Sequence, residues 1–240
     1  MATYAAASDI VNTALQELGM GTVNLAAGAL DATGWQMLGL LNALGDELVR
    51  AHDWQTLERT MQFTGDGTTT NFALPDDFGR QVNQTQWSAS DNRPMQGSVS
   101  PQIWAWDQYG IVAPGVFYQY RILNDSYAVY PTPSSGAVFD LYYISKNWVR
   151  KFNTVPVEYT YKVELAGDIP QFDRRLMIAG LKLKYWAAKG LDTSVLAEEF
   201  NYLLSNEKGA TQGAPVINLS PPAGPLLVGW QNVPDSGYGF

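Results

Sequence analysis

The sequence predicts an α+β protein in which a four-helix bundle carries a large inserted antiparallel β domain and an extended C-terminal tail. Two stretches with helical periodicity come before residue 54, and two more follow residue 165. The residues between them are aromatic and β-branched runs separated by Pro, Gly, Asn, Asp and Ser, which is typical of strands and turns. We therefore expect an N-terminal helix pair over 1–53, a β-rich insert over 54–165, a C-terminal helix pair over 166–210 and a tail over 211–240.

The N-terminal pair begins with Ser8, which we expect to cap the first helix. Thr33 and Gln36 fit a capping box for a second helix that runs to about His52. This second helix has an apolar stripe at helical spacing, formed by Met37, Leu38, Leu41, Leu44, Leu48 and Ala51.

Two glycines interrupt the second helix, Gly39 and Gly45. Each one lowers helix propensity by roughly 1 kcal/mol relative to Ala. We expect them to let a neighbouring helix approach closely.

The insert starts with two short strand-like runs on either side of Gly65-Asp66-Gly67, a pattern that predicts a tight hairpin. Pro75 should end the second of these strands, because proline cannot donate to a strand ladder. No helix of ordinary length is expected inside the insert. Further strands are predicted over 82–88, 102–106, 116–123, 127–130 and 138–148.

The C-terminal pair is expected to begin at Asp168-Ile169-Pro170, with proline in the first helical turn, and its first helix to end at Gly190. A last helix should run from about Asp192 to Lys208. The inner face of the first of these helices is predicted to hold Phe172, Leu176, Met177, Leu183 and Trp186, and its opposite face a basic cluster of Arg174, Arg175, Lys182, Lys184 and Lys189.

The tail from Thr211 to Phe240 is rich in Pro and Gly, has almost no charge and shows no period of 2 or 3.6. It is nevertheless apolar, and a freely solvated segment is usually polar. We infer that the tail is ordered against its own bundle or a neighbouring subunit.

The composition limits the possible functions. The net charge is −8 and the sequence pI is about 4.6, so the chain has no general attraction to nucleic acid. Only 16% of the residues are charged and 12% are aromatic, which favours burial against partners or a large core. There is no cysteine, no secretory signal and no apolar run long enough to cross a membrane.

Catalytic motifs are missing, so we predict a protein that is not an enzyme and has no cofactor and no metal site. His52 is the only histidine and is expected at a helix end. Asp76 and Asp77 are adjacent and should point apart, whereas catalytic carboxylates face each other. The Gly65-Asp66-Gly67-Thr68 turn lacks the lysine of a phosphate-binding loop.

Two features remain after this search. The first is the aromatic density of the insert, where Trp and Tyr either stack on sugars, anchor a protein interface or, most often, fill a β core. The second is the basic cluster, which is usually a solvated face paired with residues such as Glu198 or Glu199. The other possibility is that it meets an acidic partner or DNA.

Several segments in order resemble the head-to-tail adaptors of short-tailed bacteriophages, the tail tubular protein A or head-completion class. The resemblance spans roughly residues 8–208. It rests on His52-Asp53-Trp54, on Phe72-Ala73-Leu74-Pro75-Asp76-Asp77-Phe78, on Trp87, and on a helix that opens at Asp168-Ile169-Pro170 and ends Tyr185-Trp186-Ala187-Ala188-Lys189-Gly190.

The resemblance implies a virion protein that assembles as a homo-oligomeric ring, usually of twelve copies, after synthesis in the host cytoplasm. The ring joins the portal protein to the tail nozzle protein, extends the channel for packaged double-stranded DNA and helps to retain the genome. The expected portal or subunit interface holds Arg174, Arg175, Lys182, Lys184, Leu226, Leu227, Trp230, Tyr238 and Phe240. The expected nozzle interface holds Trp87, Trp104, Trp106 and Tyr109. The alternative is a carbohydrate-binding or receptor-recognition module of a phage tail.

Overall fold

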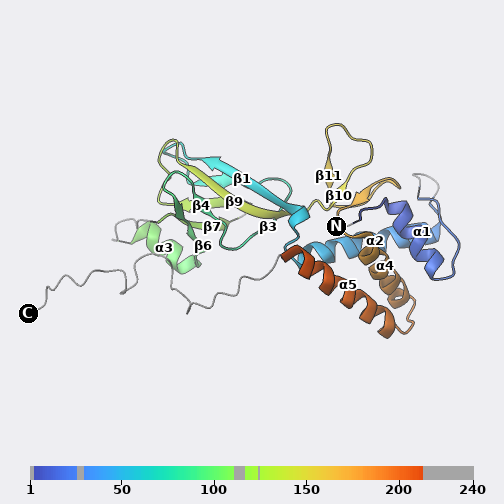
Figure 1. Cartoon of the computed structure of the whole chain (residues 1–240). Coiled ribbons are helices and arrows are strands. Elements are labelled where there is room, and N and C mark those ends of the chain that lie inside the picture. Colours follow the sequence, from blue (N-terminus) through green and yellow to red (C-terminus); the bar gives the residue numbers. More distant parts are fainter. Residues whose placement is uncertain (1–2, 26–29, 111–116, 124, 213–240) are drawn as a thin grey trace, which may run out of the picture.

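The computed structural model describes residues 3–25, 30–110, 117–123 and 125–212. In this part of the chain, most of the helices gather at one end and two packed sheets form the other, so the predicted α+β class is confirmed (Figure 1). The helices described are α1 (Ala7–Glu17), α2 (Ala32–Ala51), α3 (Pro101–Tyr109), α4 (Arg174–Ala188) and α5 (Ser194–Gln212), with a short 3-10 turn η1 (Gln55–Leu57).

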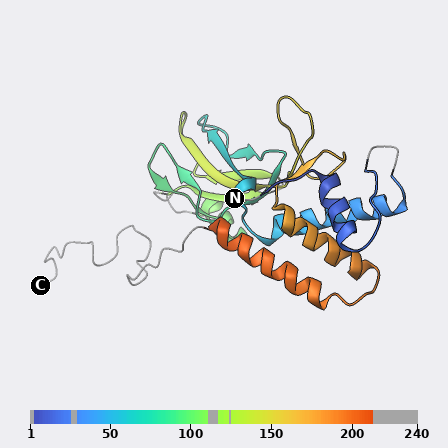
Figure 2. The ribbon, with the colours of Figure 1, turned by 45° about the vertical axis from the view of Figure 1, so that its right-hand side comes forward.

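Helix α4 is the centre of the helical part, because α1, α2 and α5 all pack against it (Figure 2). Every residue from Leu176 to Lys182 is buried, so α4 has no single inner face. The sequence-based placement of Lys182 on the outer side is wrong, since this residue is only 6% exposed. A helix covered by three others buries side chains that an amphipathic pattern assigns to solvent.

The starts of two helices differ from prediction. The N-cap of α1 is Ala6 instead of Ser8, and backbone bonds to another segment replace a side-chain cap there: the Ala7 N–H donates to the Asp168 carbonyl at 2.8 Å. The N-cap of α2 is Asp31 instead of Thr33, and its carboxylate accepts from the Gly34 N–H at 2.6 Å. Asp is at least as good an N-cap as Thr, so the earlier residue starts the helix.

Helix α4 also starts later than expected. Its N-cap is Asp173, whose carboxylate accepts from the backbone N–H groups of Arg175 and Leu176. The predicted opening at Asp168-Ile169-Pro170 is wrong, because Ile169–Pro170 forms strand β12. Proline fits this strand as well as a first helical turn, so it did not fix the helix start.

The β part is a sandwich of two mainly antiparallel sheets. In the first sheet β1 (Glu58–Thr64) pairs with β9 (Val138–Ser145), and β9 also pairs with β3 (Phe78–Gln81) and β4 (Trp87–Ser88), which is joined by β5 (Arg93–Pro94). In the second sheet the order is β2 (Asn71–Ala73), β8 (Ser126–Tyr130), β7 (Gln119–Leu123) and β6 (Gln96–Gly97), with β6 parallel to β7.

The predicted hairpin at Gly65-Asp66-Gly67 is wrong, because the strands on its two sides belong to different sheets: β1 pairs with β9, whereas β2 pairs with β8. The Asp66 carboxylate accepts from the N–H groups of Thr68 and Thr69, and these bonds turn the chain from one sheet to the other. The pKa of Asp66 is lowered, mainly by the hydrogen bond from the Thr69 hydroxyl and then by these two N–H groups, since hydrogen bonds favour the ionised carboxylate.

Aromatic rings hold the two sheets together. The Phe63 ring of β1 stacks on Phe139 of β9 at 5.0 Å between centroids, and it also contacts Phe72 and Tyr127 of the second sheet. Phe139 and Tyr127 are fully buried. Of the Trp and Tyr residues on which the prediction of an aromatic β core rested, Tyr120 and Tyr143 are buried in the sandwich, whereas Trp106, Tyr109 and Tyr142 are exposed.

A third sheet lies against the helices instead of the sandwich, and comprises β10 (Val149–Arg150), β11 (Tyr159–Thr160) and β12. Trp148, just before it, belongs to the helical core. A Cβ atom on Gly45 would lie 2.1 Å from the Trp148 ring, so this glycine admits an aromatic side chain and not a neighbouring helix. Gly39 faces open space. The predicted boundary at residue 165 stays a prediction.

One helix was missed. Residues 102–106 were predicted as a strand, but they lie in α3, which starts at a Ser100 N-cap with Pro101 in its first turn. Ser followed by Pro is a helix-start signal. This signal was overridden by the apolar run Ile103-Trp104-Ala105-Trp106. Bulky aromatic and β-branched residues are enriched in strands, so the run was interpreted as a strand.

Candidate interaction surfaces

The basic cluster of α4 is tied into the helical part by ion pairs. Lys182 contacts Glu17 of α1 at 2.7 Å and Glu199 of α5 at 3.3 Å, and Arg175 contacts the same two carboxylates. Two cations and two anions thus join three helices. The predicted pairing with Glu199 is confirmed.

The network also affects the titration of Glu17. Burial alone would raise the pKa of Glu17, but the hydrogen bonds from Lys182 and Arg175 outweigh it, and the pKa lies below the ordinary 4.5. The network therefore favours the charged form of this carboxylate.

The other two predicted interface cations are paired as well. Arg174 donates to Asp9 at 2.6 Å and to Thr13 at 2.9 Å, and Lys184 contacts Glu47 at 2.6 Å. The hydrogen bond from Arg174 is the main reason that the pKa of Asp9 is lowered. All four cations have partners within the chain, which gives them a structural role whether or not they also contact another protein.

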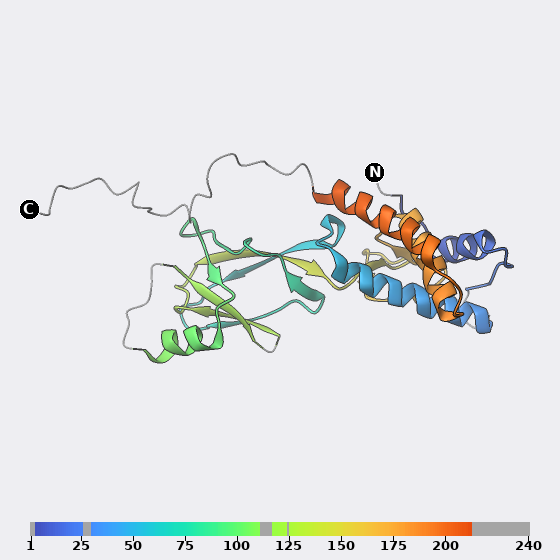
Figure 3. The same ribbon diagram turned by 90° about the horizontal axis from the view of Figure 1, so that it is seen from below.

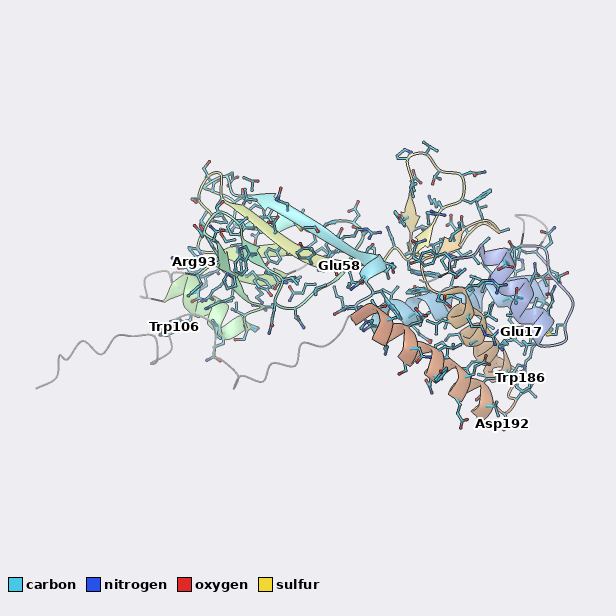
Figure 4. All side chains as sticks on the ribbon, viewed as in Figure 1. Glu17, Glu58, Arg93, Trp106, Trp186 and Asp192 are labelled. Atoms are coloured by element: carbon cyan, nitrogen blue, oxygen red, sulfur yellow. The ribbon has the colours of Figure 1, made fainter. Side chains whose placement is uncertain are left out.

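The four aromatic residues predicted to meet the nozzle separate into two groups. Trp104 is buried and packs edge-on against Tyr130, so it anchors α3 on the second sheet. Trp106 and Tyr109 of α3 are 63% and 83% exposed, and Trp87 of β4 is 44% exposed. Helix α3 lies at the end of the molecule farthest from α1, as the positions of Trp106 and Glu17 show (Figure 4). Exposed aromatic residues of this kind are common anchors of protein interfaces.

The predicted tail contacts Leu226, Leu227, Trp230, Tyr238 and Phe240 lie outside the described residues. A hollow of about 250 Å³ lies where α5 ends, next to the start of that tail, and is lined in part by Tyr4, Trp54, Glu207 and Thr211. Burial raises the pKa of Glu207, and the nearby Asp173 carboxylate raises it further. A hollow of mixed apolar and acidic character therefore lies at the C-terminal end of α5.

One arginine of the sandwich makes several hydrogen bonds to the helical part. Arg80 of β3 donates to the carbonyls of Val49 and His52, at 2.7 and 2.6 Å, and to the Asp53 carboxylate. It thereby caps the C-terminal end of α2, where a cation is favoured. The sequence analysis missed Arg80, and nothing in the local pattern around Gly79-Arg80-Gln81 signals this contact.

The Leu74-Pro75-Asp76-Asp77-Phe78 segment is held to strand β9. The Asp77 carboxylate accepts from the hydroxyls of Tyr143 at 2.9 Å and Ser145 at 2.8 Å. Burial, reinforced by this carboxylate, raises the pKa of Tyr143 to about 12. The two aspartates thus serve the turn, as the sequence predicted.

The described ranges hold no candidate metal site and no membrane-spanning helix. No group of three or more His, Cys, Asp or Glu side chains in them is arranged to hold a metal ion. None of the helices in these ranges is both long and apolar enough to cross a membrane. What the described residues offer instead is exposed aromatic and apolar surface at several places.

These surfaces define a protein suited to binding other proteins. The chain belongs to the SU10 adaptor protein family, whose model matches residues 5–176, more than half of the 240 residues. The family is one of phage head–tail adaptors, so the chain is a structural phage protein and a component of the virion. No curated protein matches the chain.

Proposed function

We propose that this protein forms the ring that joins the portal to the tail nozzle, extends the DNA channel and helps to retain the packaged genome. Adaptor family membership is the observation that carries the proposal. The separation of a helical part from a sandwich with exposed aromatic residues at its far end supports it, because an adaptor needs two different ends (Figure 3). Twelve copies, as in the tail tubular protein A class, and assembly in the host cytoplasm belong to the same proposal.

In this proposal the helical part acts as one four-helix bundle that docks on the portal, with the tail as its main contact. Leu226, Leu227 and Trp230 are apolar residues that could anchor such a contact, and a buried Trp at an interface typically contributes about 2–4 kcal/mol. The α3 surface, with Trp106 and Tyr109, meets the nozzle. These residues are exposed in the single chain, which leaves them free to contact a partner.

Packaged DNA passes through the ring without sequence-specific binding. The net charge of −8 supports this, because an acidic wall repels phosphates and lets the genome slide. A basic lumen in the assembled ring would contradict this part of the proposal.

The test is a cut after Gln212, which keeps α5 complete and removes 213–240. The truncated protein should give the circular dichroism spectrum and melting temperature of a folded protein but fail to co-sediment with purified portal. The double variant Trp106→Ala and Tyr109→Ala is the matched control, because it should keep portal binding and lose nozzle binding. Normal portal binding by the truncated protein would refute the role of the tail.

A further inference from the structure

The hairpin over residues 151–161, here called the finger, exposes apolar side chains beyond the third sheet. Val155 is 97% exposed, Val157 56% and Tyr161 54%. Contiguous apolar surface of this kind is uncommon on a protein that works alone. The sequence analysis did not single out this segment.

The finger is held in shape by many polar contacts. At its base the buried Asp168 carboxylate accepts from the Phe152 N–H at 3.1 Å, and from two further N–H groups in the 164–165 loop. Across the hairpin Lys151 pairs with Glu158 at 3.2 Å, and the Lys151 N–H donates to the Glu158 carbonyl at 3.0 Å. An apolar tip on a hydrogen-bonded base loses little conformational entropy when it binds.

A second exposed apolar surface runs along α5 and its entry, here called the α5 face. It comprises Leu191, Val195 and Tyr202, which are 52%, 74% and 67% exposed. Val195 and Tyr202 are seven residues apart, so they lie on one side of α5, and Leu191 comes just before the helix. The finger and helix α5 lie on opposite sides of the helical part (Figures 1 and 2).

The charges beside the two surfaces are of opposite sign. Arg150, at the base of the finger, is exposed and has no ion pair among the described residues. Glu198, on the outward side of α5 between Val195 and Tyr202, is exposed and is likewise unpaired within the described ranges. A finger meeting another finger would bring two arginines together, and an α5 face meeting another would bring two acids together. Finger against α5 face is the pairing that charge favours.

We propose that the finger of one copy docks on the α5 face of the next copy. Two different patches on opposite sides of one molecule make a head-to-tail contact, which leads to a ring when the rotation closes. This inference rests on the proposed ring function, because it names the surfaces through which neighbouring subunits meet.

The test uses single-cysteine variants, since the chain has no cysteine of its own. Val155→Cys and Tyr202→Cys proteins are mixed at high concentration with a short bifunctional maleimide, without portal or tail protein. A cross-linked dimer should form in the mixture and not in either variant alone. A dimer from Val155→Cys alone, or no dimer in the mixture, overturns the proposal.

A second measurement uses charge. Val155→Asp and Tyr202→Asp should each abolish self-association in analytical ultracentrifugation, and mixing the two should restore dimers and nothing larger, because one intact contact remains. Asn153→Asp and Asn201→Asp add the same charge beside each surface and should leave self-association unchanged. If the mixture stays monomeric while wild type associates, the head-to-tail pairing is refuted. Portal binding of the wild type is measured separately, so failure of the adaptor role and failure of this contact give different results.

Discussion

The helical part and the β sandwich are held together by different kinds of interaction. In the helical part, ion pairs from Arg174, Arg175, Lys182 and Lys184 link α4 to its three neighbours around a core that is mainly aliphatic but includes Trp54, Trp148 and Phe172. Within described residues 58–145 the only ion pair is Arg80–Asp53, which leads out to α2. The sandwich relies instead on stacked aromatic rings such as Phe63 and Phe139.

This difference has a physical cause. Lys182 is buried where three helices meet, so its charge needs carboxylate partners, whereas Arg175 is partly exposed and joins the same carboxylates from the surface. A two-sheet sandwich sends alternate side chains to solvent and needs only a layer of large apolar groups between the sheets. We therefore expect acid and salt to act mainly on the helical part, and the loss of a buried side chain to act most strongly on the sandwich.

The largest effect expected is the loss of an aromatic ring from the sandwich. Phe139→Ala removes a fully buried ring that contacts Phe63 and Tyr118, and should lower the free energy of unfolding by about 3–5 kcal/mol. Tyr142→Ala on the same strand is the control, because that side chain is 40% exposed and its loss should cost much less. Urea denaturation measures both, and equal losses would show that ring stacking is not what holds the sheets.

The next effect tests packing in the helical part. Gly45→Ala should destabilise the protein by about 1–3 kcal/mol, because the new methyl group meets the Trp148 ring. Gly39→Ala in the same helix has nothing within 4 Å and should stabilise by about 0.5–1 kcal/mol. Thermal melts distinguish the two signs, and a stabilising Gly45→Ala would mean that the ring moves freely.

The ion-pair network should respond more weakly. Lys182→Met should cost about 1–2 kcal/mol, less than a fully buried pair, because Glu17 and Glu199 are each 31% exposed and keep Arg175. Lys184→Met breaks a pair whose Glu47 is 66% exposed, and should cost about 0–1 kcal/mol. Denaturation curves at low and high salt check this, and identical losses would remove the distinction between the two lysines.

The smallest effects concern pH, and the two regions should respond at opposite ends of the scale. The pKa values of Glu17 and Asp9 are lowered, so their stabilising contribution is present above the ordinary values of 4.5 and 3.8 and is lost as pH falls through the depressed values. The pKa of Glu207 is raised, so protonation of this carboxyl favours the folded state as pH falls. It therefore offsets part of the stability lost through Glu17 and Asp9. Glu17→Gln should flatten the fall of melting temperature in acid.

In alkali the sandwich should weaken first. The pKa of Tyr143 is raised to about 12 from 10.0, so its contribution is complete below pH 10 and is lost as pH rises through 12. Tyr143→Phe should flatten the alkaline limb of the melting curve and leave the acid limb unchanged. If Tyr143→Phe changed the acid limb instead, or Glu17→Gln the alkaline limb, the proposed difference between the two regions would be wrong.

The sequence predicted elements better than it predicted their partners. Helical spacing identified α2 through Met37, Leu41 and Leu44, and aromatic runs identified β8 and β9, because these signals are local. The pairing of β1 with β9 joins residues about 80 positions apart, from Glu58↔Ile144 to Thr64↔Val138, and no local pattern encodes it.

For the interaction surfaces, too, contacts between residues close in sequence were predicted and contacts between distant segments were not. The pairing of the basic cluster with Glu199 was predicted because that residue is near in sequence, whereas Glu17 and Asp9 are not. Trp104 and Trp106 were grouped together, yet a helix separates a buried ring from an exposed one two residues later. The finger and Arg80 lacked any composition signal, since their roles arise only when distant segments meet.

The guanidinium of Arg80 has a consequence for geometry as well as for stability. It gathers two carbonyls and a carboxylate at the end of α2, and it acts together with Ile144 of β9 and Val82, which pack against the helical core, to set the tilt between the sandwich and the helices. In the collar that we propose, every protomer repeats that tilt, and a small angular error would be multiplied around the circumference. The fidelity of the closed circle would then depend on how stiffly this junction holds the two parts together.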